Sequence, residues 1–415
     1  MAFVLALAAP FPSSVQALLA STPSWALLAL IFVSALGVAL AATPVLRDAA
    51  LRYGWVDVPD ERKVHQTPIP RVGGIAIFLG LTLGLGLAYL VRDLLPFVIP
   101  PRTWAIWIGA LVLFATGLYD DLFGLGFKRK FVVQLVVAYA MVAAGFHFRL
   151  EGVPLLGDLG VYHQLWIALP FTLLWIVGIM NAINLLDGLD GLAAGVSLIA
   201  LLALAVAFAG NGDVGMVVLA LALAGGIVGF LVYNFNPASI FMGDSGSLVL
   251  GFMLAMYSIQ GVGQADPMLA LVVPIVALGL PIMDTSVTFF RRLAQNRSPF
   301  MPDGDHIHHR VRQHTVSHRQ AVLVLYAIGV VFGATAVLVS TGGMLRAALL
   351  MVGLVAFIYV LIRHLGYVRL TTTMRRLYVR RLLRQRASQR EEDTRRIPGR
   401  PVRRERASEV LAEAS

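Results

Sequence analysis

The sequence predicts an all-α polytopic membrane protein with about eleven transmembrane helices. Three observations lead to this fold class. The 415-residue chain is 58% hydrophobic and only 13% charged, whereas about 25% of a soluble protein's residues are charged. Its apolar residues gather in stretches long enough to cross a bilayer. Its basic residues are concentrated on one side of those stretches, as the positive-inside rule requires.

The spans follow one another with charged or polar residues at their boundaries. Arg47 follows the first, Arg92 the second, Asp120 the third and Arg149 the fourth. The predicted ranges are roughly 24–46, 72–91, 103–119, 131–148, 164–183, 192–210, 214–233, 240–260, 268–290, 321–341 and 344–364. The segments 47–71, 120–130, 184–191, 234–240, 291–320 and 363–415 then lie on one side of the membrane.

The distribution of basic residues gives the predicted orientation. If the C-terminal tail is cytosolic, the inner segments hold 29 of the 33 Lys and Arg. An odd number of spans places the N-terminus outside. No basic residue precedes the first apolar run, so a cleaved signal peptide is not expected. The chain has no cysteine, which excludes disulfides and thiolate metal sites.

Composition divides the chain into two predicted domains. Residues 1–365 form an integral membrane domain, and 366–415 form a basic, largely disordered cytosolic tail. Fourteen arginines lie between Arg369 and Arg406, so the net charge of +10 is not a nucleic-acid signature. The first part of the tail is expected to lie on anionic lipid headgroups. A solvated tail without a catalytic part is the simpler interpretation.

Four polar residues at the end of the fifth span form the most informative motif. Asn181, Asn184, Asp187 and Asp190 follow one another at intervals of three. Acids at membrane depth are costly and are usually functional, and amide and carboxylate oxygens suit a hard cation such as Mg²⁺. Two glycines within 187–191 indicate that the helix loosens and exposes backbone amides. A transporter with a broken helix remains an alternative.

Two further acidic sites occur at the ends of apolar segments. Asp120 and Asp121 end the third span, with Lys130 ten residues later, and their mutual repulsion indicates a cation or a proton-accepting role. Acids are disfavoured at a helix C-terminus, so solvated charge there is the weaker explanation. Asp244 opens another helix, whose free amides would attract phosphate oxygens while its carboxylate holds a metal. An N-cap role for Asp244 or Ser245 is the structural alternative.

The first inner segment brings positive charge close to the membrane surface. Lys63, His65 and Arg71 are the candidate binding residues there, and the paired Gly73 and Gly74 would allow a close approach of the backbone to a ligand. Anchoring by the positive-inside rule explains Lys63 and Arg71 equally well.

The largest inner loop contains a histidine-rich segment. His306, His308, His309 and Arg310 are expected to bind a nucleotide diphosphate through hydrogen bonds and charge. No cysteine or HExxH spacing accompanies the histidines, so a zinc site is disfavoured. Asp284, in the preceding span, is expected either to join the site or to pair with a basic neighbour.

Taken together, the motifs resemble a known family. Their order from about residue 45 to 320 is similar to that of the polyprenyl-phosphate N-acetylhexosamine-1-phosphate transferases, of glycosyltransferase 4 type. The resemblance implies transfer of a sugar 1-phosphate from a UDP-sugar to undecaprenyl or another polyprenyl phosphate, with release of UMP. It implies Mg²⁺, with Mn²⁺ as a substitute, and a multi-pass enzyme of the bacterial cytoplasmic membrane in cell-envelope glycan synthesis. A homodimer is left open, and no nucleic-acid partner is implied.

The resemblance also implies roles for individual residues. Asn184 and Asp244 match the metal ligands, and Phe241 matches an aromatic residue that stacks on uracil. The residues matching catalytic positions of the family are Asp120, Asp121, Lys130, Asp187 and Asp190. Attack of one phosphate on another opposes two anions, so a site at the inner membrane surface must neutralise charge and align the reactants.

The pattern of the histidine segment favours one donor sugar. His306-Ile-His-His309 is similar to the WecA/TagO branch, whereas the MraY branch carries three consecutive histidines. UDP-N-acetylglucosamine is therefore the expected donor, and UDP-N-acetylgalactosamine or UDP-N-acetylmuramoyl-pentapeptide is the alternative. A multi-span transporter is less favoured, because all the acidic motifs gather on one membrane face. CDP-alcohol phosphotransferases are excluded, since the stretch 187–194 lacks the Ala-Arg pair of their signature.

Overall fold

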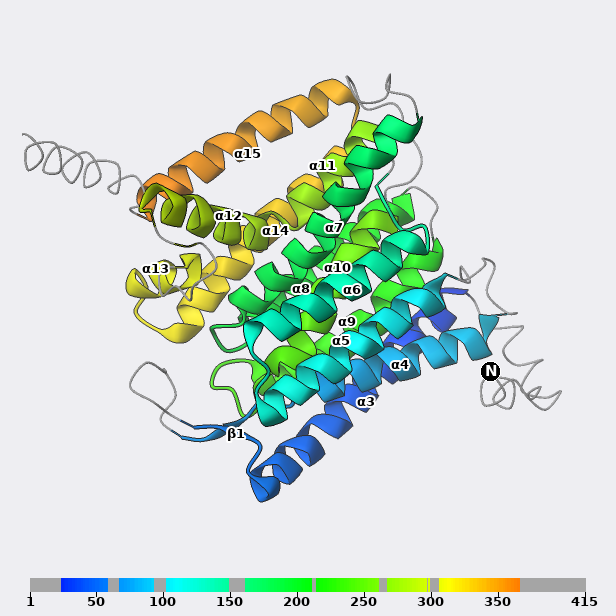
Figure 1. Ribbon diagram of the computed structural model, residues 1–415, viewed down its shortest axis with the longest axis vertical. Coiled ribbons are helices and arrows are strands. Elements are labelled where there is room, and N and C mark those ends of the chain that lie inside the picture. Colours follow the sequence, from blue (N-terminus) through cyan, green and yellow to red (C-terminus); the bar gives the residue numbers. More distant parts are fainter. Residues whose placement is uncertain are drawn as a thin grey trace, which may run out of the picture. The chain divides into compact units, whose positions relative to one another are not determined.

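The computed structural model describes residues 24–58, 67–92, 102–148, 161–210, 214–260, 267–296, 298 and 306–365 (Figure 1). Two short antiparallel strands, β1 (Val56–Asp57) and β2 (Ile69–Pro70), form a hairpin. The helices in the described ranges are α3 (Ser24–Tyr53), α4 (Gly74–Leu90), α5 (Thr103–Phe123), α6 (Phe127–Ala143), α7 (Val161–Leu186), α8 (Leu192–Gly210), α9 (Val214–Asn234), α10 (Gly243–Gln260), α11 (Pro267–Ala277), α12 (Gly279–Ala294), α13 (Ile307–Gln313), α14 (His318–Ser340) and α15 (Met344–His364).

Each predicted span coincides with a helix or, for 268–290, with the pair α11 and α12. Among the described residues, seven helices are long and apolar enough to cross a membrane, or eight if that bent pair is one span. Helices α4 and α6 have only 17 residues each, and α10 begins with the polar run Gly-Asp-Ser-Gly-Ser. The all-α polytopic class is therefore confirmed, whereas the count of eleven is not.

Several helices run beyond their predicted ends. Helix α3 continues to Tyr53 instead of residue 46, α7 to Leu186 instead of 183, and α12 to Ala294 instead of 290. Charged residues such as Arg47 and Asp48 thus belong to a helix, because helical geometry continues after the apolar run has ended. Apolar length alone does not mark where the backbone stops being helical.

Helix α10 is the central helix of the bundle. It packs against α4, α5, α7 and α8, and it lies among these helices in Figure 1. Every residue from Ser245 to Ile259 is buried, since a helix that is apolar on all sides finds partners on all sides. The N-terminal end of α10 carries Asp244, so the buried helix fixes the position of that carboxylate.

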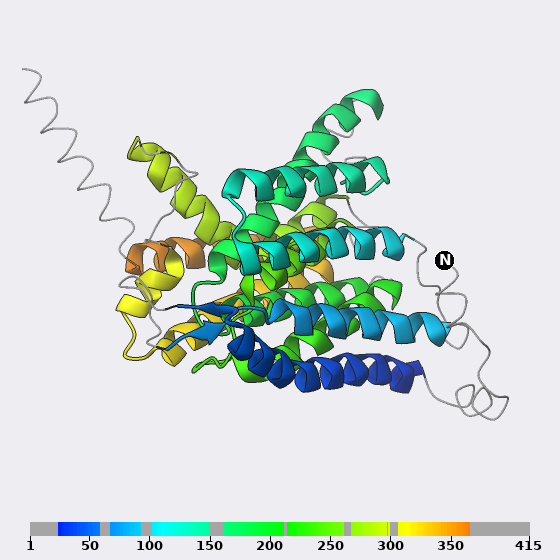
Figure 2. The same cartoon turned by 60° about the horizontal axis from the view of Figure 1, so that its bottom comes forward.

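Helices α3, α4 and α9 lie side by side (Figure 2). Glycines permit the close contact between α3 and α9, because a Cβ at Gly225 would overlap the carbonyl oxygen of Phe32. A Cβ at Gly229 would come 2.6 Å from the carbonyl oxygen of Leu36. Small residues at helix interfaces allow such backbone approach in membrane proteins.

The segment predicted as one span at 268–290 is broken. Helices α11 and α12 meet at an angle of 79°, with Leu278 between them. Pro281 lies in the first turn of α12 and lacks the N–H that would continue the helical ladder. The side chain of Phe332 from α14 packs against Gly279, leaving no space for a Cβ there.

The chain divides into two compact units, Met1–Leu354 and Val355–Ser415. The first contains all the candidate site residues. In the second, the structure describes the end of α15 and Leu365. The predicted tail at 366–415 and the candidates Lys63 and His65 lie outside the described residues.

Candidate active site

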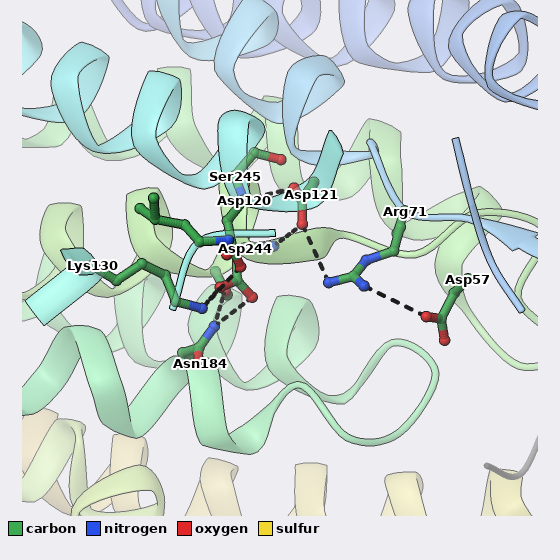
Figure 3. Close-up of polar contacts among 10 residues, drawn as sticks. Asp57, Arg71, Asp120, Asp121, Lys130, Asn184, Asp244 and Ser245 are labelled. Carbon is green, nitrogen blue, oxygen red and sulfur yellow. Dashed lines mark hydrogen bonds and ion pairs between the residues drawn. The ribbon is translucent and has the colours of Figure 1, made fainter. Parts of the chain in front are cut away.

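Three helices bring acidic residues and Lys130 together at one end of the bundle. Asp120 and Asp121 lie in the last turn of α5, Lys130 in the first turn of α6, and Asp244 at the start of α10. Because the helices run alternately up and down, the end of one and the start of the next meet at the same face. Figure 3 shows these side chains pointing toward one another.

Lys130 lies between two carboxylates. Its Nζ donates to Asp120 Oδ2 at 2.9 Å and to Asp244 Oδ2. Side-chain exposure is 19% for Lys130, 10% for Asp120 and 16% for Asp244. These partly screened pairs hold the ammonium group in one place, where it offsets the negative charge of both acids.

Asn184 connects α7 to the same carboxylate. Its Nδ2 donates to Asp244 Oδ1 at 3.0 Å and to Ser247 Oγ at 2.8 Å. Asp244 therefore accepts from α6 on one oxygen and from α7 on the other. Asn181, one turn earlier, instead donates to Gln134 of α6 at 2.8 Å, so it holds two helices together away from Asp244.

Asp121 caps the start of α10. Its side chain is fully buried, and it accepts from the backbone N–H groups of Asp244 at 2.8 Å and Ser245 at 3.0 Å. The expectation that these amides would attract phosphate oxygens is therefore wrong, because a carboxylate of the protein already binds them. Arg71 forms two ion pairs, which Figure 3 marks: its Nη2 lies 3.6 Å from Asp121 Oδ1, and its Nη1 lies 3.5 Å from Asp57 Oδ1.

Glycines let three segments converge behind the acids. A Cβ at Gly74 would overlap the backbone of Gly246, and a Cβ at Gly117 would come 2.5 Å from Asp244 O. The backbone N–H of Gly73 donates to Phe241 O at 2.9 Å. The glycine pair predicted to approach a ligand thus approaches other parts of the chain, since the first inner segment pairs with the residues before α10.

The turn between α7 and α8 has the loosened backbone that its glycines predicted. Helix α7 ends at Leu186 and α8 begins at Leu192, and Gly191 adopts φ of +76°, a conformation in which a Cβ is unfavourable. The freed amides are satisfied within the protein, because Gly191 N–H donates to Asn234 Oδ1 at 3.1 Å.

A cavity of about 600 Å³ opens beside this network. Seven of the predicted site residues line it: Arg71, Asn184, Asp187, Asp190, Phe241, Asp244 and His309. Asp120, Asp121 and Lys130 adjoin it through Asp244 without lining it. The cavity therefore receives polar side chains from the β hairpin, the 187–191 turn, the 234–243 segment and α13.

Asp187 is the acid whose environment most disfavours its charge. Burial, followed by repulsion from Asp244 and Asp121, raises its pKa from 3.8 to about 8, against an opposing influence of Arg71. A group with such a shift in a cavity is a candidate for catalysis or cation binding. Burial is the larger cause, and the neighbouring acids add to it, since burial makes each further negative charge more costly.

The histidine segment divides between the cavity and the protein interior. His306 and His308 are buried, at 4% and 2% exposure, and their Nδ1 atoms lie 3.3 and 3.9 Å from Asp284 Oδ2. Only His309 lines the cavity. Of the three histidines predicted to bind the donor, two thus lie beside Asp284 and away from the cavity wall.

Asp284 also holds the helix that follows. Its Oδ1 accepts from the backbone N–H of Ile307 at 2.7 Å, which satisfies a free amide at the start of α13. Of the two alternatives predicted for Asp284, pairing with basic neighbours is the one observed. Arg310 lies on the same short helix but does not line the cavity.

Several lining residues were not predicted. Asp57, Thr67, Asn234, Asn236 and His318 belong to the cavity wall. The two asparagines lie in the polar stretch before α10, so their proximity to Asp244 in sequence was a usable signal. His318 stands alone at the start of a predicted span, where positive-inside anchoring is the simplest explanation, and only the tertiary fold brings it to the cavity.

No group of three or more His, Asp or Glu side chains that could enclose a metal ion occurs among the described residues. The carboxylates of Asp244 and Asp187 and the amide of Asn184 are among the oxygen donors that line the cavity. A cation bound here would take its remaining ligands from water or from a phosphate, which is how Mg²⁺ is usually held.

Comparison with known proteins gives consistent matches. A family model described as glycosyl transferase family 4 matches residues 103–262. The chain is similar to a probable undecaprenyl-phosphate N-acetylglucosaminyl 1-phosphate transferase of Bacillus subtilis (strain 168), with 37% identity over 81% of this chain and 92% of the relative. A decaprenyl-phosphate N-acetylglucosaminephosphotransferase of Mycobacterium leprae is 35% identical over 82% of this chain and 92% of its own length.

A third relative is more distant. The undecaprenyl-phosphate alpha-N-acetylglucosaminyl 1-phosphate transferase of Salmonella typhi is 31% identical over 69% of this chain and 77% of its own length. The matched family model begins at α5 and ends just after α10. It therefore includes the residues that form the Lys130–Asp244 network.

Proposed function

We propose that this chain, which belongs to the glycosyl transferase family 4, transfers N-acetylglucosamine 1-phosphate from UDP-N-acetylglucosamine to a polyprenyl phosphate and releases UMP. One observation carries the proposal: charged groups of α5 and α6 and the amide of Asn184 from α7 meet at Asp244 of α10, beside a cavity that also receives Arg71 and His309. The transporter alternative is set aside, because the chain is a member of a transferase family.

The reaction joins two anionic phosphates, so the site must reduce their repulsion. Lys130 supplies a fixed positive charge next to Asp244, and Arg71 supplies another at the cavity wall. In this proposal both charges attract the phosphate oxygens, and Phe241 offers a flat apolar face to the uracil base. Positioning together with charge stabilisation accounts for most catalysis of phosphoryl transfer.

Mg²⁺ is the proposed cofactor, with Mn²⁺ able to replace it. Asp244, Asn184 and Asp187 would hold it, since their oxygens suit a hard cation. The carboxylates gathered here repel one another, and a bound cation would reduce that repulsion. When bound, Mg²⁺ would supply positive charge to the diphosphate of the donor. Repulsion from Asp244 and Asp121 adds to the burial that raises the pKa of Asp187.

The acid pair on α5 receives two different roles. Asp121 is proposed as a positioning residue, because its buried carboxylate holds the start of α10. Asp120 is proposed to hold Lys130 and to remain close enough to the acceptor phosphate to accept its proton. Asp190 is proposed to shape the cavity wall through Asn236 and Ala238.

The donor and the membrane setting are also proposals. The names of the relatives and the His306-Ile-His-His309 pattern favour N-acetylglucosamine over a muramoyl-pentapeptide. Twenty-nine of 33 basic residues on one side favour a cytosolic site, an outer N-terminus and an inner C-terminus. The relatives named above are bacterial, which favours the cytoplasmic membrane.

The deciding experiment is a UMP-release assay on purified full-length protein in detergent. Undecaprenyl phosphate and Mg²⁺ are supplied, with UDP-N-acetylglucosamine, UDP-N-acetylgalactosamine or UDP-N-acetylmuramoyl-pentapeptide in separate reactions. We expect lipid-dependent UMP only with the first donor, loss of activity with EDTA, and recovery with Mg²⁺ or Mn²⁺. Release with another donor alone would reject the assigned sugar, and UMP release unaffected by EDTA would reject the metal.

A further inference from the structure

A histidine that the motifs did not include stands at the cavity wall. His318 is the first residue of α14 and lines the cavity together with Asp187 and Asp190. Ser317 caps the helix, since its Oγ accepts from the backbone N–H of Gln320 at 3.2 Å. This cap fixes where α14 begins and therefore where the imidazole lies.

The imidazole acts as a hydrogen-bond acceptor. The backbone N–H of Asp190 donates to His318 Nε2 at 3.0 Å. A backbone amide can only donate, so Nε2 carries no proton and the neutral ring is protonated on Nδ1. The bond joins residues that lie 128 positions apart in the sequence, and it ties α14 to the turn between α7 and α8.

The same turn supports a second wall of the cavity. Asp190 Oδ2 accepts from Asn236 Nδ2 at 2.8 Å and from the backbone N–H of Ala238 at 3.1 Å. Tyr326 of α14 donates to the carbonyl oxygen of Gly191. Helix α14 thus holds Asp190 and Gly191 of the turn. Asp190 also holds the 236–238 segment.

Asp187 depends on this turn for its position. Within the described part of the chain, its carboxylate accepts no hydrogen bond and forms no ion pair, although Asn184, one turn earlier, is held by two. The position of the Asp187 side chain therefore depends on the backbone of the 187–191 turn. Asp190 and Gly191 of that turn are bonded to α14.

We infer that His318 is a positioning residue: its Nε2 holds the 187–191 turn so that Asp187 faces the phosphate groups of the donor. The inference rests on the proposed function for its catalytic consequence. It differs from a packing role in one respect, because it requires an acceptor atom at the place of Nε2 and not merely a side chain of similar size.

Two amide substitutions separate these roles. The oxygen of Gln reaches about as far as Nε2, whereas the oxygen of Asn reaches only about as far as Nδ1, and both offer the same acceptor chemistry. His318→Gln should keep kcat within about threefold of wild type, and His318→Asn should lower it by about tenfold, with the KM for UDP-N-acetylglucosamine changed less than about threefold. His314→Asn, on an exposed histidine outside the cavity, is the matched control and should match wild type.

Hydrogen exchange of the 187–191 amides in the full-length protein supplies a readout that needs no substrate. We expect faster exchange there in His318→Asn than in His318→Gln or in the control. Equal exchange and equal kcat in the two amide variants would overturn the inference, whether both resemble wild type or both are impaired. A wild-type protein that releases no UMP would instead reject the proposed function, and the exchange comparison would still decide whether Nε2 holds the turn.

Discussion

The acid network around Asp244 and the histidine segment were both expected to meet the ligand, and they are built differently. In the network, Asp120, Lys130 and Asp244 retain between 10% and 19% of their side-chain exposure. In the histidine segment, His306 and His308 are buried against Asp284, and only His309 reaches the cavity.

The difference shows that one motif can contain residues for chemistry and residues for architecture. At Asp244, ion pairs connect partly exposed groups to a carboxylate that lines the cavity. At Asp284, the Oδ2 atom lies 3.3 Å from His306 Nδ1 and 3.9 Å from His308 Nδ1, and Oδ1 accepts from the first residue of α13. The comparison predicts that substitutions near Asp244 reduce activity more than stability, and that substitutions near Asp284 do the reverse.

Asp244→Asn should produce the largest effect. It removes a negative charge that accepts from Lys130 and Asn184, and in the proposed site it removes a metal ligand. UMP release should fall by about 10³-fold, or about 4 kcal/mol in the activation barrier, while Tm changes little. Asp48→Asn, an exposed aspartate of α3, is the control, and near-normal turnover of Asp244→Asn would show that this carboxylate is not needed.

Lys130→Met should come second. Two carboxylates lose the ammonium group between them, so the phosphate groups meet a more negative site. We expect kcat to fall by about 10²-fold, with partial recovery in Lys130→Arg. The exposed Lys128 on the same helix supplies the control Lys128→Met, and an equal loss in that variant would point to surface charge instead.

His308→Ala and His309→Ala together test the division within the histidine segment. The buried His308 packs over Gly188, where a Cβ would lie 2.6 Å from its Nε2. Its loss should lower Tm through the space left behind and leave the KM of the folded fraction unchanged. His309→Ala should raise the KM for the UDP-sugar by about tenfold with an unchanged Tm. The opposite pattern would refute the assignment.

The smallest effect concerns the pH dependence of stability without metal. The pKa of Asp187 in the folded state, about 8, lies above the ordinary value of 3.8, so the folded protein binds the extra proton. Raising the pH from about 5 to about 8 should therefore lower Tm in EDTA, because the folded state loses that proton at a cost. Asp187→Asn should flatten the dependence, and Mg²⁺ should reduce it in wild type. A wild-type Tm that rises over this interval would contradict the assignment.

Much of the fold could be predicted because membrane spans are a local property of sequence. The apolar stretches coincide with helices from α3 to α15. The break at Leu278 was missed, since both halves are apolar and the bend comes from Pro281 and the contact of Gly279 with Phe332. Most of the predicted residues at the cavity were found because polar groups in apolar surroundings are conspicuous, whereas Phe241 was found only through the family resemblance.

The rest of the site depends on contacts that no local pattern contains. In the sequence Asp121 looks equivalent to Asp120, yet it caps the start of α10, which lies more than a hundred residues later in the chain. His318 reads as a basic residue at a membrane boundary, yet it accepts from Asp190. Asp284 reads as an intramembrane acid, and its partners lie beyond the loop that follows it. These roles follow from tertiary neighbours.

The burial of α10 bears on how the protein is made. Its partners α4, α5, α7 and α8 all precede it in the chain, so a ribosome delivers them to the membrane first. Alone, α10 is too polar at its start to qualify as a span, and lipid would be a poor solvent for its Asp and Ser side chains. Earlier helices provide a docking place for it, and the carboxylate of Asp121 is already there to receive its first amides. The Lys130–Asp244 network therefore forms only once α10 has docked, and the cavity is completed later still by His309 of α13 and His318 of α14.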